Sequence, residues 1–303
     1  MTNQDKEKIL FITARDKYAT DSFRLSGYKV QRPYKDKNIF ERCLRELWFR
    51  LHLPERVWYV PIEDTRKYEY IIVQDPLITH KYLEWLIKNY PEPKIVFSYC
   101  NMVGKAKHLY PKDIPSIITL WTYDEFDATK YGMNLLHSGG YSKSFIVENN
   151  KKEYDVFYVG ADKGRGDYLV ELERQMSSMG LNTKFIITKD GRFSKKKPYY
   201  SKRINYHEVT QYNSKSRAIL NIILPDQKGA TMRDYESIFN GVKLITNNKN
   251  IKKYDFYKKR NVFILGEDDF HSLKNFINSP YQKLEDDILE KHTLDEMIKE
   301  MIL

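Results

Sequence analysis

Two loops in the second half of the chain carry residue types that bind a diphosphate. The first follows the apolar segment 154–160 and contains Gly160, Lys163 and Arg165. Glycine lets a ligand come close to the backbone, and the helix predicted next presents N–H groups to an anion. Charge-assisted hydrogen bonds from Lys163 and Arg165 would contribute about 1.5–3 kcal/mol each. The loop fits a plain solvated connection equally, because it lacks both the Walker A sequence and G-x-G-x-x-G.

The second loop leads into a helix and is followed by an apolar strand, in GATMRDYESIFNGVKLITNN. The loop supplies Gly229 and Thr231, and the helix supplies Arg233 and Glu236. A carboxylate near a helix start accepts hydrogen bonds from the vicinal hydroxyls of a ribose, which is the role considered for Glu236. Arg233 in the first turn opposes the helix dipole, and a bound phosphate would explain it. The alternative is a surface Arg233–Glu236 pair, worth about 0.2–0.5 kcal/mol.

Acidic residues that follow predicted strands in the first half are candidates for a general base or for acceptor binding. The cluster consists of Asp124, Glu125 and Asp127, and Asp16 and Asp75 are further candidates for the same role. A base there would remove the proton from an attacking hydroxyl group. The cluster also fits the first turn of a helix, where carboxylates are favourable.

Strands and helices must hold these residues in position. The chain alternates short apolar segments with amphipathic helices. The predicted strands are 8–14, 68–75, 94–100, 116–123, 154–160, 183–188, 216–224, 242–248 and 261–266. The predicted helices include 38–51, 79–90 with Thr79 as N-cap, 167–180 ending at Gly180, and 233–241 ending at Gly241. This alternation indicates parallel sheets covered on both faces. Ligands of such sheets bind beyond the carboxyl ends of the strands.

A polar stretch at 148–154, ENNKKEY, is predicted to link two domains. We therefore expect an α/β protein with two Rossmann-like domains, 1–150 and 151–280, that face a cleft. C-terminal helices are expected over 281–303, with the option of packing back on the first domain. Ser279-Pro280 is predicted to open this helical segment, and Thr293 with Glu296 to form a capping box for the last helix.

The order VGADKGRGDYLVEL, SKSRAILNI and GATMRDYESIFNGVKLITNN resembles the donor domain of bacterial GT-B glycosyltransferases. The resemblance is closest to the capsule and lipopolysaccharide type related to the CgeB-like group, and it covers residues 154–270. It implies that Glu236 holds the ribose of a nucleotide sugar and that Lys163 and Arg165 face its diphosphate. It also implies that Gly229, Thr231 and Arg233 line the donor site.

The resemblance further implies transfer of a sugar to a surface glycan, which is lipid-linked, without a metal or other cofactor. The segment TLWTYDEFDATKYGMNLLHSGGYS at 119–142 resembles a part of the same enzymes and carries the acidic cluster. Retaining members often carry a second glutamate at the position that is Gly229 here, so retention and inversion both stay open. The absence of D-x-D and of metal-ligand histidine spacing agrees with a metal-free reaction.

The composition limits the classes of protein that fit. Hydrophobic residues make up 41% and charged residues 30% of 303, which is typical of a globular chain. Two cysteines, Cys43 and Cys100, and the absence of a signal sequence or a long apolar window predict a cytoplasmic protein. The net charge of +10 predicts a polyanionic partner: nucleic acid, an anionic membrane surface or a phosphorylated substrate.

Two basic segments leave alternatives open. Helix 38–51 carries three arginines and an apolar side, and it either lies at the inner face of a membrane or packs on its own core. Loop 189–203 mixes cations with Phe193, Tyr199 and Tyr200, which either stack on bases or belong to a solvated loop. A nucleic-acid-binding or modifying protein is therefore one alternative function, and an inactive GT-B scaffold that binds a partner is another. The apolar side of the helix consists of Ile39, Phe40, Cys43, Leu44, Leu47, Trp48 and Leu51.

Overall fold

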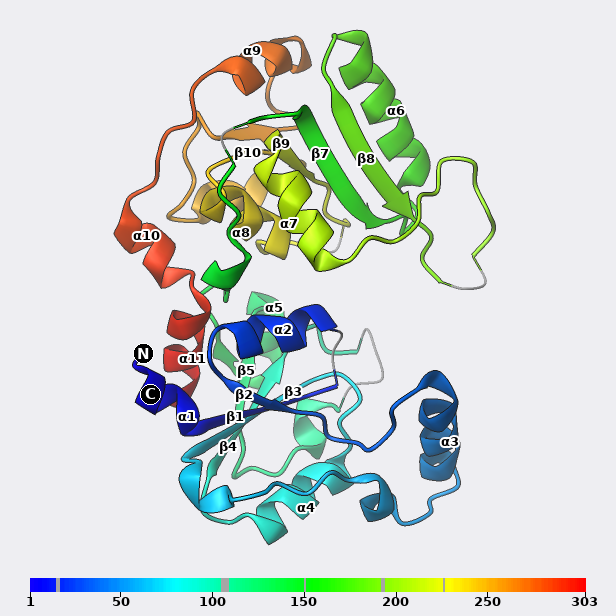
Figure 1. The fold of residues 1–303 in the computed structure, drawn as a ribbon, viewed down its shortest axis with the longest axis vertical. Coiled ribbons are helices and arrows are strands. Elements are labelled where there is room, and N and C mark those ends of the chain that lie inside the picture. The colour runs from blue at the N-terminus through cyan, green and yellow to red at the C-terminus, as the bar shows by residue number, and fades with distance from the viewer. Residues whose placement is uncertain (15–16, 105–108, 150, 192–193, 226) are drawn as a thin grey trace. The chain divides into compact units, whose positions relative to one another are not determined.

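The computed structural model describes residues 1–14, 17–104, 109–149, 151–191, 194–225 and 227–303. The chain forms two compact units (Figure 1): the first comprises 1–144 and 294–303, and the second comprises 145–293. The boundary after Ser144 precedes the predicted linker 148–154. The segment 281–303, expected as one block, is instead divided at Thr293 between the two units.

The first unit contains a six-stranded parallel sheet in the order β2-β1-β3-β4-β5-β6. Its strands are β1 (Ile9–Thr13), β2 (Lys29–Gln31), β3 (Tyr70–Gln74), β4 (Lys94–Tyr99), β5 (Thr119–Thr122) and β6 (Asn134–Leu135). Its helices are α1 (Asn3–Glu7), α2 (Lys17–Leu25), α3 (Ile39–Arg50), α4 (His80–Asn89), α5 (Glu125–Tyr131) and α11 (Leu294–Ile302). Four of the strands match predicted ones, whereas β2 and β6 are too short to show an apolar run.

Both faces of this sheet are buried. Alternate side chains of β1 and β3 separate to the two faces, as the period of a strand requires. Leu10 and Val73 pack with Leu83 of α4 on one face. On the other face, Phe11 packs with Phe23 of α2 and with the α11 residues Leu294, Ile298 and Met301. Helix α11 therefore belongs to the first unit and contributes three buried side chains to its core.

The second unit contains a five-stranded parallel sheet in the order β11-β10-β9-β7-β8. Its strands are β7 (Tyr154–Ala161), β8 (Thr183–Thr188), β9 (Ser216–Asn221), β10 (Lys243–Thr246) and β11 (Val262–Ile264). Its helices are α6 (Gly166–Ser178), α7 (Tyr206–Ser214), α8 (Met232–Phe239), α9 (Leu273–Asn278) and α10 (Asp286–Lys291). Helices α6 and α9 pack on one face, through Leu172 and Ile277, and α7 packs on the other, through Val209.

Helix boundaries follow the chemistry of their end residues. Thr79 caps α4, as predicted, because its side chain accepts a hydrogen bond from the Tyr82 amide. Gly180 (φ 75°) and Gly241 (φ 58°) follow α6 and α8 in the left-handed conformation that ends a helix. The helix predicted to start at Ser279-Pro280 is wrong, because the next helix begins only at Asp286. Among the described residues, no helix combines the length and apolar character that crossing a membrane requires.

Candidate functional site at the carboxyl edge of the second sheet

The second sheet has its topological switch point between β7 and β9, because the chain turns from β7 toward β8 on one side and from β9 toward β10 on the other. In sheets of this kind the crevice beyond these two strand ends binds ligands. Arg165, the residue before α6, spans the two ends. Its guanidinium donates to the carbonyl oxygen of Ile222 after β9 and, at 3.4 Å, to that of Ala161 in β7.

Tyr158 lies beside this arginine and was not predicted from the sequence. A Cβ atom on Gly160 would lie 2.7 Å from the Tyr158 hydroxyl and 3.4 Å from the guanidinium of Arg165, so glycine makes room for both. The Tyr158 hydroxyl is buried and has no hydrogen-bond partner among the described residues. Burial raises the pKa of Tyr158, and the positive charges of Arg165 and Arg233 partly offset that rise. The Arg165 guanidinium lies 6.0 Å from the centre of the Tyr158 ring.

The start of α8 is tied to the end of β9 by a buried polar network. Thr231 caps the helix, accepting from the Arg233 amide at 3.2 Å and donating its own amide to Asp234 at 2.6 Å. Asn221, the last residue of β9, donates to Thr231 at 3.0 Å and to Asp234 at 2.8 Å. Burial raises the pKa of Asp234 to about 6, against the opposing effect of these hydrogen bonds. This network fixes the position of Arg233 relative to the strand ends.

Glu236 has protein partners instead of an open face. Its carboxylate is fully buried and accepts from Tyr206 at 2.8 Å and from Asn213 at 3.0 Å, both on α7, and pairs with Arg233. The Arg233–Glu236 pair considered as an alternative therefore exists; its carboxylate is fully buried, whereas the Arg233 side chain leaves 23% of its surface exposed. The predicted ribose contact has no exposed carboxylate surface to use in this conformation.

The remaining predicted donor residues, Gly229 and Lys163, lie on different sides of the second sheet. The Gly229 carbonyl accepts from Asn248 at 3.2 Å, and the next amide donates to Tyr254, so the turn before α8 is held from the β10 side. Lys163 lies at the β8 side, where its amide donates to Asp190 at 2.7 Å and its side chain is exposed. The structure thus gathers Gly160, Arg165, Thr231, Arg233 and Glu236 at the strand ends, while the printed contacts of Lys163 lie elsewhere.

Asp162 is a second residue that the sequence did not single out. It accepts from the Gly166 amide at 2.7 Å, from Tyr200 at 2.6 Å and from Tyr199 at 3.2 Å. Burial opposes its ionisation, but these hydrogen bonds and the charge of Lys197 hold the pKa of Asp162 at about 2. It fixes both the start of α6 and the end of the basic loop.

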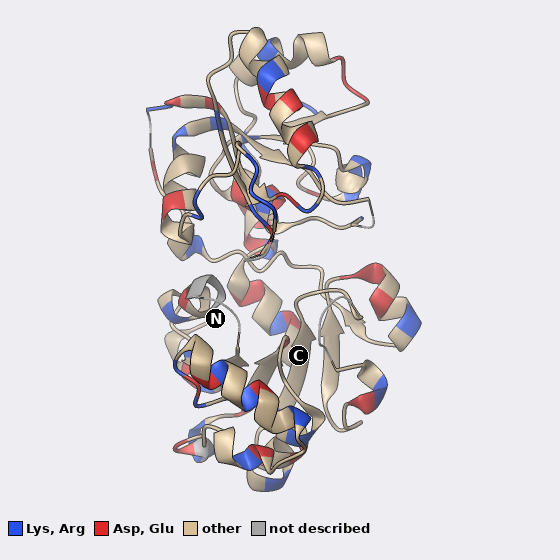
Figure 2. Ribbon diagram, turned by 90° about the vertical axis from the view of Figure 1, so that its right-hand side faces the viewer, with Lys and Arg blue, Asp and Glu red and all other residues tan. Residues whose placement is uncertain are grey.

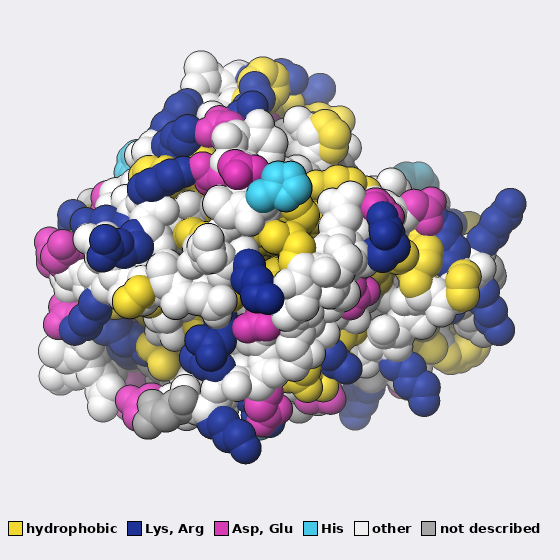
Figure 3. All heavy atoms as spheres, turned by 90° about the horizontal axis from the view of Figure 1, so that it is seen from above, with side chains coloured by type: hydrophobic (Ala, Val, Ile, Leu, Met, Phe, Trp, Pro, Cys, Tyr) yellow, Lys and Arg dark blue, Asp and Glu magenta, His cyan; other side chains and the backbone are white. Residues whose placement is uncertain are grey.

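This anchoring changes the interpretation of loop 189–203. Tyr199 and Tyr200 are part-buried against the core of the second unit, so their rings do not form an open platform for bases. Phe193, the third aromatic residue of the interpretation, lies outside the described residues. Lys and Arg are interspersed with Asp and Glu on both units (Figure 2), and the face in Figure 3 shows no single basic patch.

The acidic candidates of the first unit are mostly structural. Asp124 caps α5 by accepting from the Asp127 amide at 2.9 Å, and buried Asp127 accepts from the Val103 amide at 2.7 Å. Burial raises the pKa of Asp127. Buried Asp75 accepts from the Cys100 amide, whereas Glu125 is exposed. Asp16 lies outside the described residues.

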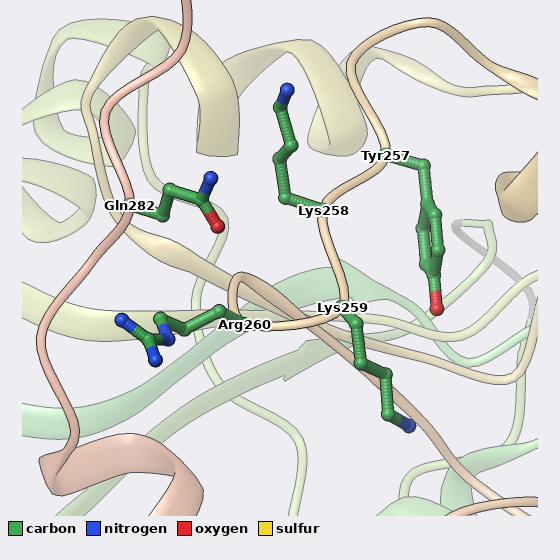
Figure 4. Close-up of a pocket in the computed structure, with 5 residues that line it drawn as sticks. All are labelled: Tyr257, Lys258, Lys259, Arg260 and Gln282. Atoms are coloured by element: carbon green, nitrogen blue, oxygen red, sulfur yellow. The ribbon is translucent and has the colours of Figure 1, made fainter.

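A broad hollow of about 790 Å³ opens on the second unit and is not lined by the predicted donor residues (Figure 4). It lies just before β11 and therefore at the amino ends of the parallel strands, whereas the predicted donor residues lie at the carboxyl ends. Two of its cations are paired, Lys258 with Glu285 and Lys259 with Asp268. Its lining residues are Tyr257, Lys258, Lys259, Arg260 and Gln282. In the described part of the chain, no three His, Cys, Asp or Glu side chains are grouped to hold a metal ion.

The two parallel sheets with helices on both faces define an α/β protein with a Rossmann-like arrangement. No protein-family model matches the chain, and no curated protein does. Among solved structures, a 2-hydroxyacid dehydrogenase from Ketogulonicigenium vulgare Y25 is similar at 8% identity, over 90% of this chain and 92% of that chain. The TM-score of 0.22 is too low for this likeness to bear on function.

Proposed function

We propose that this chain is a metal-independent GT-B glycosyltransferase, which moves a sugar from a nucleotide sugar to a surface-polysaccharide acceptor. The observation that carries the proposal is the position of two arginines: Arg165 spans the ends of β7 and β9 at the switch point, and Arg233 lies in the first turn of α8, which is tied to the end of β9. Capsule or lipopolysaccharide glycans, lipid-linked during assembly, are the class of acceptor proposed.

The arginines suit the charge that develops in this reaction. Sugar transfer releases a nucleoside diphosphate, and fixed cations stabilise the negative charge on that leaving group. Arg165 is held by two backbone carbonyls and Arg233 by a buried carboxylate, so neither guanidinium needs to reorganise as the charge develops.

Glu236 acts in this proposal as a positioning residue. It holds Arg233 and ties α8 to α7, so its effect on donor binding is transmitted through the arginine. On the acceptor side, exposed Glu125 and part-exposed Asp124 retain surface for a sugar hydroxyl, whereas Asp75 and Asp127 are buried. A lipid-linked acceptor would place the protein at the periphery of a membrane.

Calorimetric titration with UDP, GDP, dTDP and CMP, and with their sugar conjugates, tests the proposal. One of these ligands should bind with micromolar affinity and raise the unfolding temperature. The double variant Arg233→Met/Glu236→Gln, which removes both charges of the pair, should lose at least about tenfold in affinity, since a charge-assisted hydrogen bond is worth about 1.5–3 kcal/mol.

Lys283→Met is the matched control, because Lys283 is an exposed cation of the same unit that pairs with exposed Asp286 at 3.1 Å. Equal affinity of the double variant and the control, or no binding by any ligand at millimolar concentration, would overturn the proposal. Tight nucleic-acid binding that weakens steeply with salt would favour the nucleic-acid alternative. Donor binding without transfer or hydrolysis would favour the inactive scaffold.

A further inference from the structure

Helix α3 presents its apolar side to solvent. Five large apolar side chains of this segment leave between 45% and 77% of their surface exposed, whereas Arg45 in the same helix leaves 3%. The expectation that this helix packs its apolar side on its own core is therefore wrong. The exposed residues are Ile39, Phe40, Leu44, Leu47 and Leu51.

An ion pair, and not the leucines, attaches this helix to the first unit. Arg45 donates to Asp36 at 2.8 Å, and both side chains are buried. The guanidinium stacks on Tyr34, 4.3 Å from the ring centre, and on Phe49 at 5.3 Å. Because a buried pair of this kind is costly to break, it fixes which side of the helix faces inward.

The outward side is continuous. Phe40, Leu44, Leu47 and Leu51 are spaced by four, three and four residues, which places them on one face of a helix. Val57, in the turn after the helix, adds another exposed apolar side chain. Figure 1 shows α3 at the rim of the first unit, and we call its exposed apolar side chains, together with Val57, the ridge.

The charges around the ridge are mainly positive. Residues 32–57 contain seven Lys or Arg and four Asp or Glu. All four carboxylates have partners within the segment or its neighbours: Asp36 with Arg45, Glu41 with the Lys37 amide and Asn38, Glu46 with Arg42, and buried Glu55 with Tyr59 and Thr79. Exposed cations beside the ridge are Lys35, Lys37, Arg50 and Arg56. An apolar ridge flanked by cations complements the surface of an anionic bilayer, which offers an apolar interior beneath negative headgroups.

We propose that α3 docks this protein on an anionic lipid bilayer. The helix lies parallel to the membrane, with its five apolar side chains and Val57 between the headgroups and the flanking cations at the lipid phosphates. Arg45 and Asp36 hold the helix in the orientation that presents this side. The inference rests on the residues of α3 alone and stands whether or not the second unit binds a nucleotide sugar.

Cosedimentation of the full chain with vesicles tests this inference. Wild type should bind phosphatidylcholine vesicles that contain phosphatidylglycerol, bind pure phosphatidylcholine vesicles more weakly, and lose binding as salt is raised. The variant Leu44→Gln/Leu47→Gln should bind the anionic vesicles at least about tenfold more weakly, because it removes two side chains that insert. Both leucines are exposed, so circular dichroism should show an unchanged fold.

Leu25→Gln/Ile117→Gln is the matched control, since both residues are exposed apolar side chains of the first unit outside α3. It should bind vesicles like wild type, and all three proteins should bind nucleotides alike. Equal vesicle binding by wild type and the α3 variant, or equal binding to neutral and anionic vesicles, would overturn the inference. A wild-type dimer that the α3 variant converts to a monomer would also overturn it, because the ridge would then be a contact between copies.

Discussion

Arg165 donates a hydrogen bond from its side chain to the backbone carbonyl of Ile222, 57 residues later in the chain. This contact connects the turn after β7 with the end of β9, and these two ends define the switch point of the second sheet. The side chain on which the proposed donor site depends is thus also a structural tie between neighbouring strands.

Arg165→Met is therefore expected to destabilise the second unit. The Ile222 carbonyl loses a charged donor, which costs about 1–3 kcal/mol. Hydrogen exchange should become faster in β7 and β9 and stay unchanged in the strands of the first unit. Unchanged exchange in β7 and β9 would mean that the contact contributes nothing to stability.

The pair of Arg233 and Glu236 is suited to a double-mutant cycle. Arg233→Met leaves the fully buried Glu236 carboxylate without its counter-charge and should cost about 3–5 kcal/mol in unfolding free energy. Glu236→Gln should cost less, because the Arg233 side chain is 23% exposed and keeps contact with water. The double variant should cost clearly less than the sum of the two, because no unpaired charge is left behind. Urea unfolding measures all four proteins, and strictly additive effects would contradict the coupling.

Asp162 should make the second unit sensitive to acid. Its pKa in the folded chain is about 2, against an ordinary value of 3.8, so it contributes stability above pH 4. That contribution is lost as the pH falls from about 4 through 2. Asp162→Asn should lower stability at neutral pH by about 1–3 kcal/mol and flatten this acid dependence. Urea midpoints across this range compare the two proteins, and parallel curves would contradict the prediction.

Lys243 should give a dependence of the same sign at alkaline pH, because its pKa is also lowered in the folded chain. This buried lysine of β10 donates to the carbonyl oxygens of Arg260 and Phe276 and to Ser279. Burial, with a smaller effect of Arg260, lowers the pKa of Lys243 from 10.5 to about 8. Between these values the unfolded chain binds more protons than the folded chain, so this group raises stability as the pH increases from 8 to 10.5. Lys243→Met should remove this rise in unfolding free energy, and an identical rise in both proteins would refute its assignment to Lys243.

The last helix is expected to stabilise the first unit. Ile298 of α11 is fully buried against the sheet, and truncation of a large buried side chain costs about 2–5 kcal/mol. Ile298→Ala should therefore accelerate hydrogen exchange in β1 and β3 and leave β7 to β11 unaffected. Exchange that accelerates only in the second sheet would contradict the placement of α11.

Much of the fold follows from apolar runs and helix ends in the sequence. The long strands β4, β7 and β8 were predicted to within a residue at each end, because parallel strands are buried on both faces. The short strand β2 was not predicted, because three residues are too few to show a periodic pattern. The apolar period of α3 predicted the helix but could not show which side faces inward. That choice depends on Asp36 and Tyr34, which precede the helix in the chain.

The sequence predicted several residues of the candidate site, but it did not predict how they contact one another. Arg165 and Arg233 were singled out by charge at helix starts; Arg165 spans the switch point, and Arg233 lies in the first turn of the helix that is tied to the end of β9. The burial of Glu236 could not be read from its own segment, because its partners Tyr206 and Asn213 belong to a helix without a strong apolar period. Tyr158 was missed because its hydroxyl is hidden inside a strand that reads as apolar.

Because residues 294–303 complete the core of the first unit, synthesis of this chain has a built-in order. When the ribosome has made the first 144 residues, the sheet face against Phe11 and Ile72 still lacks α11. The second unit is continuous from 145 to 293 and is fully synthesised before that helix emerges. The first unit therefore starts to be synthesised first but is completed last. Until α11 emerges, chaperones can bind the apolar face of its sheet.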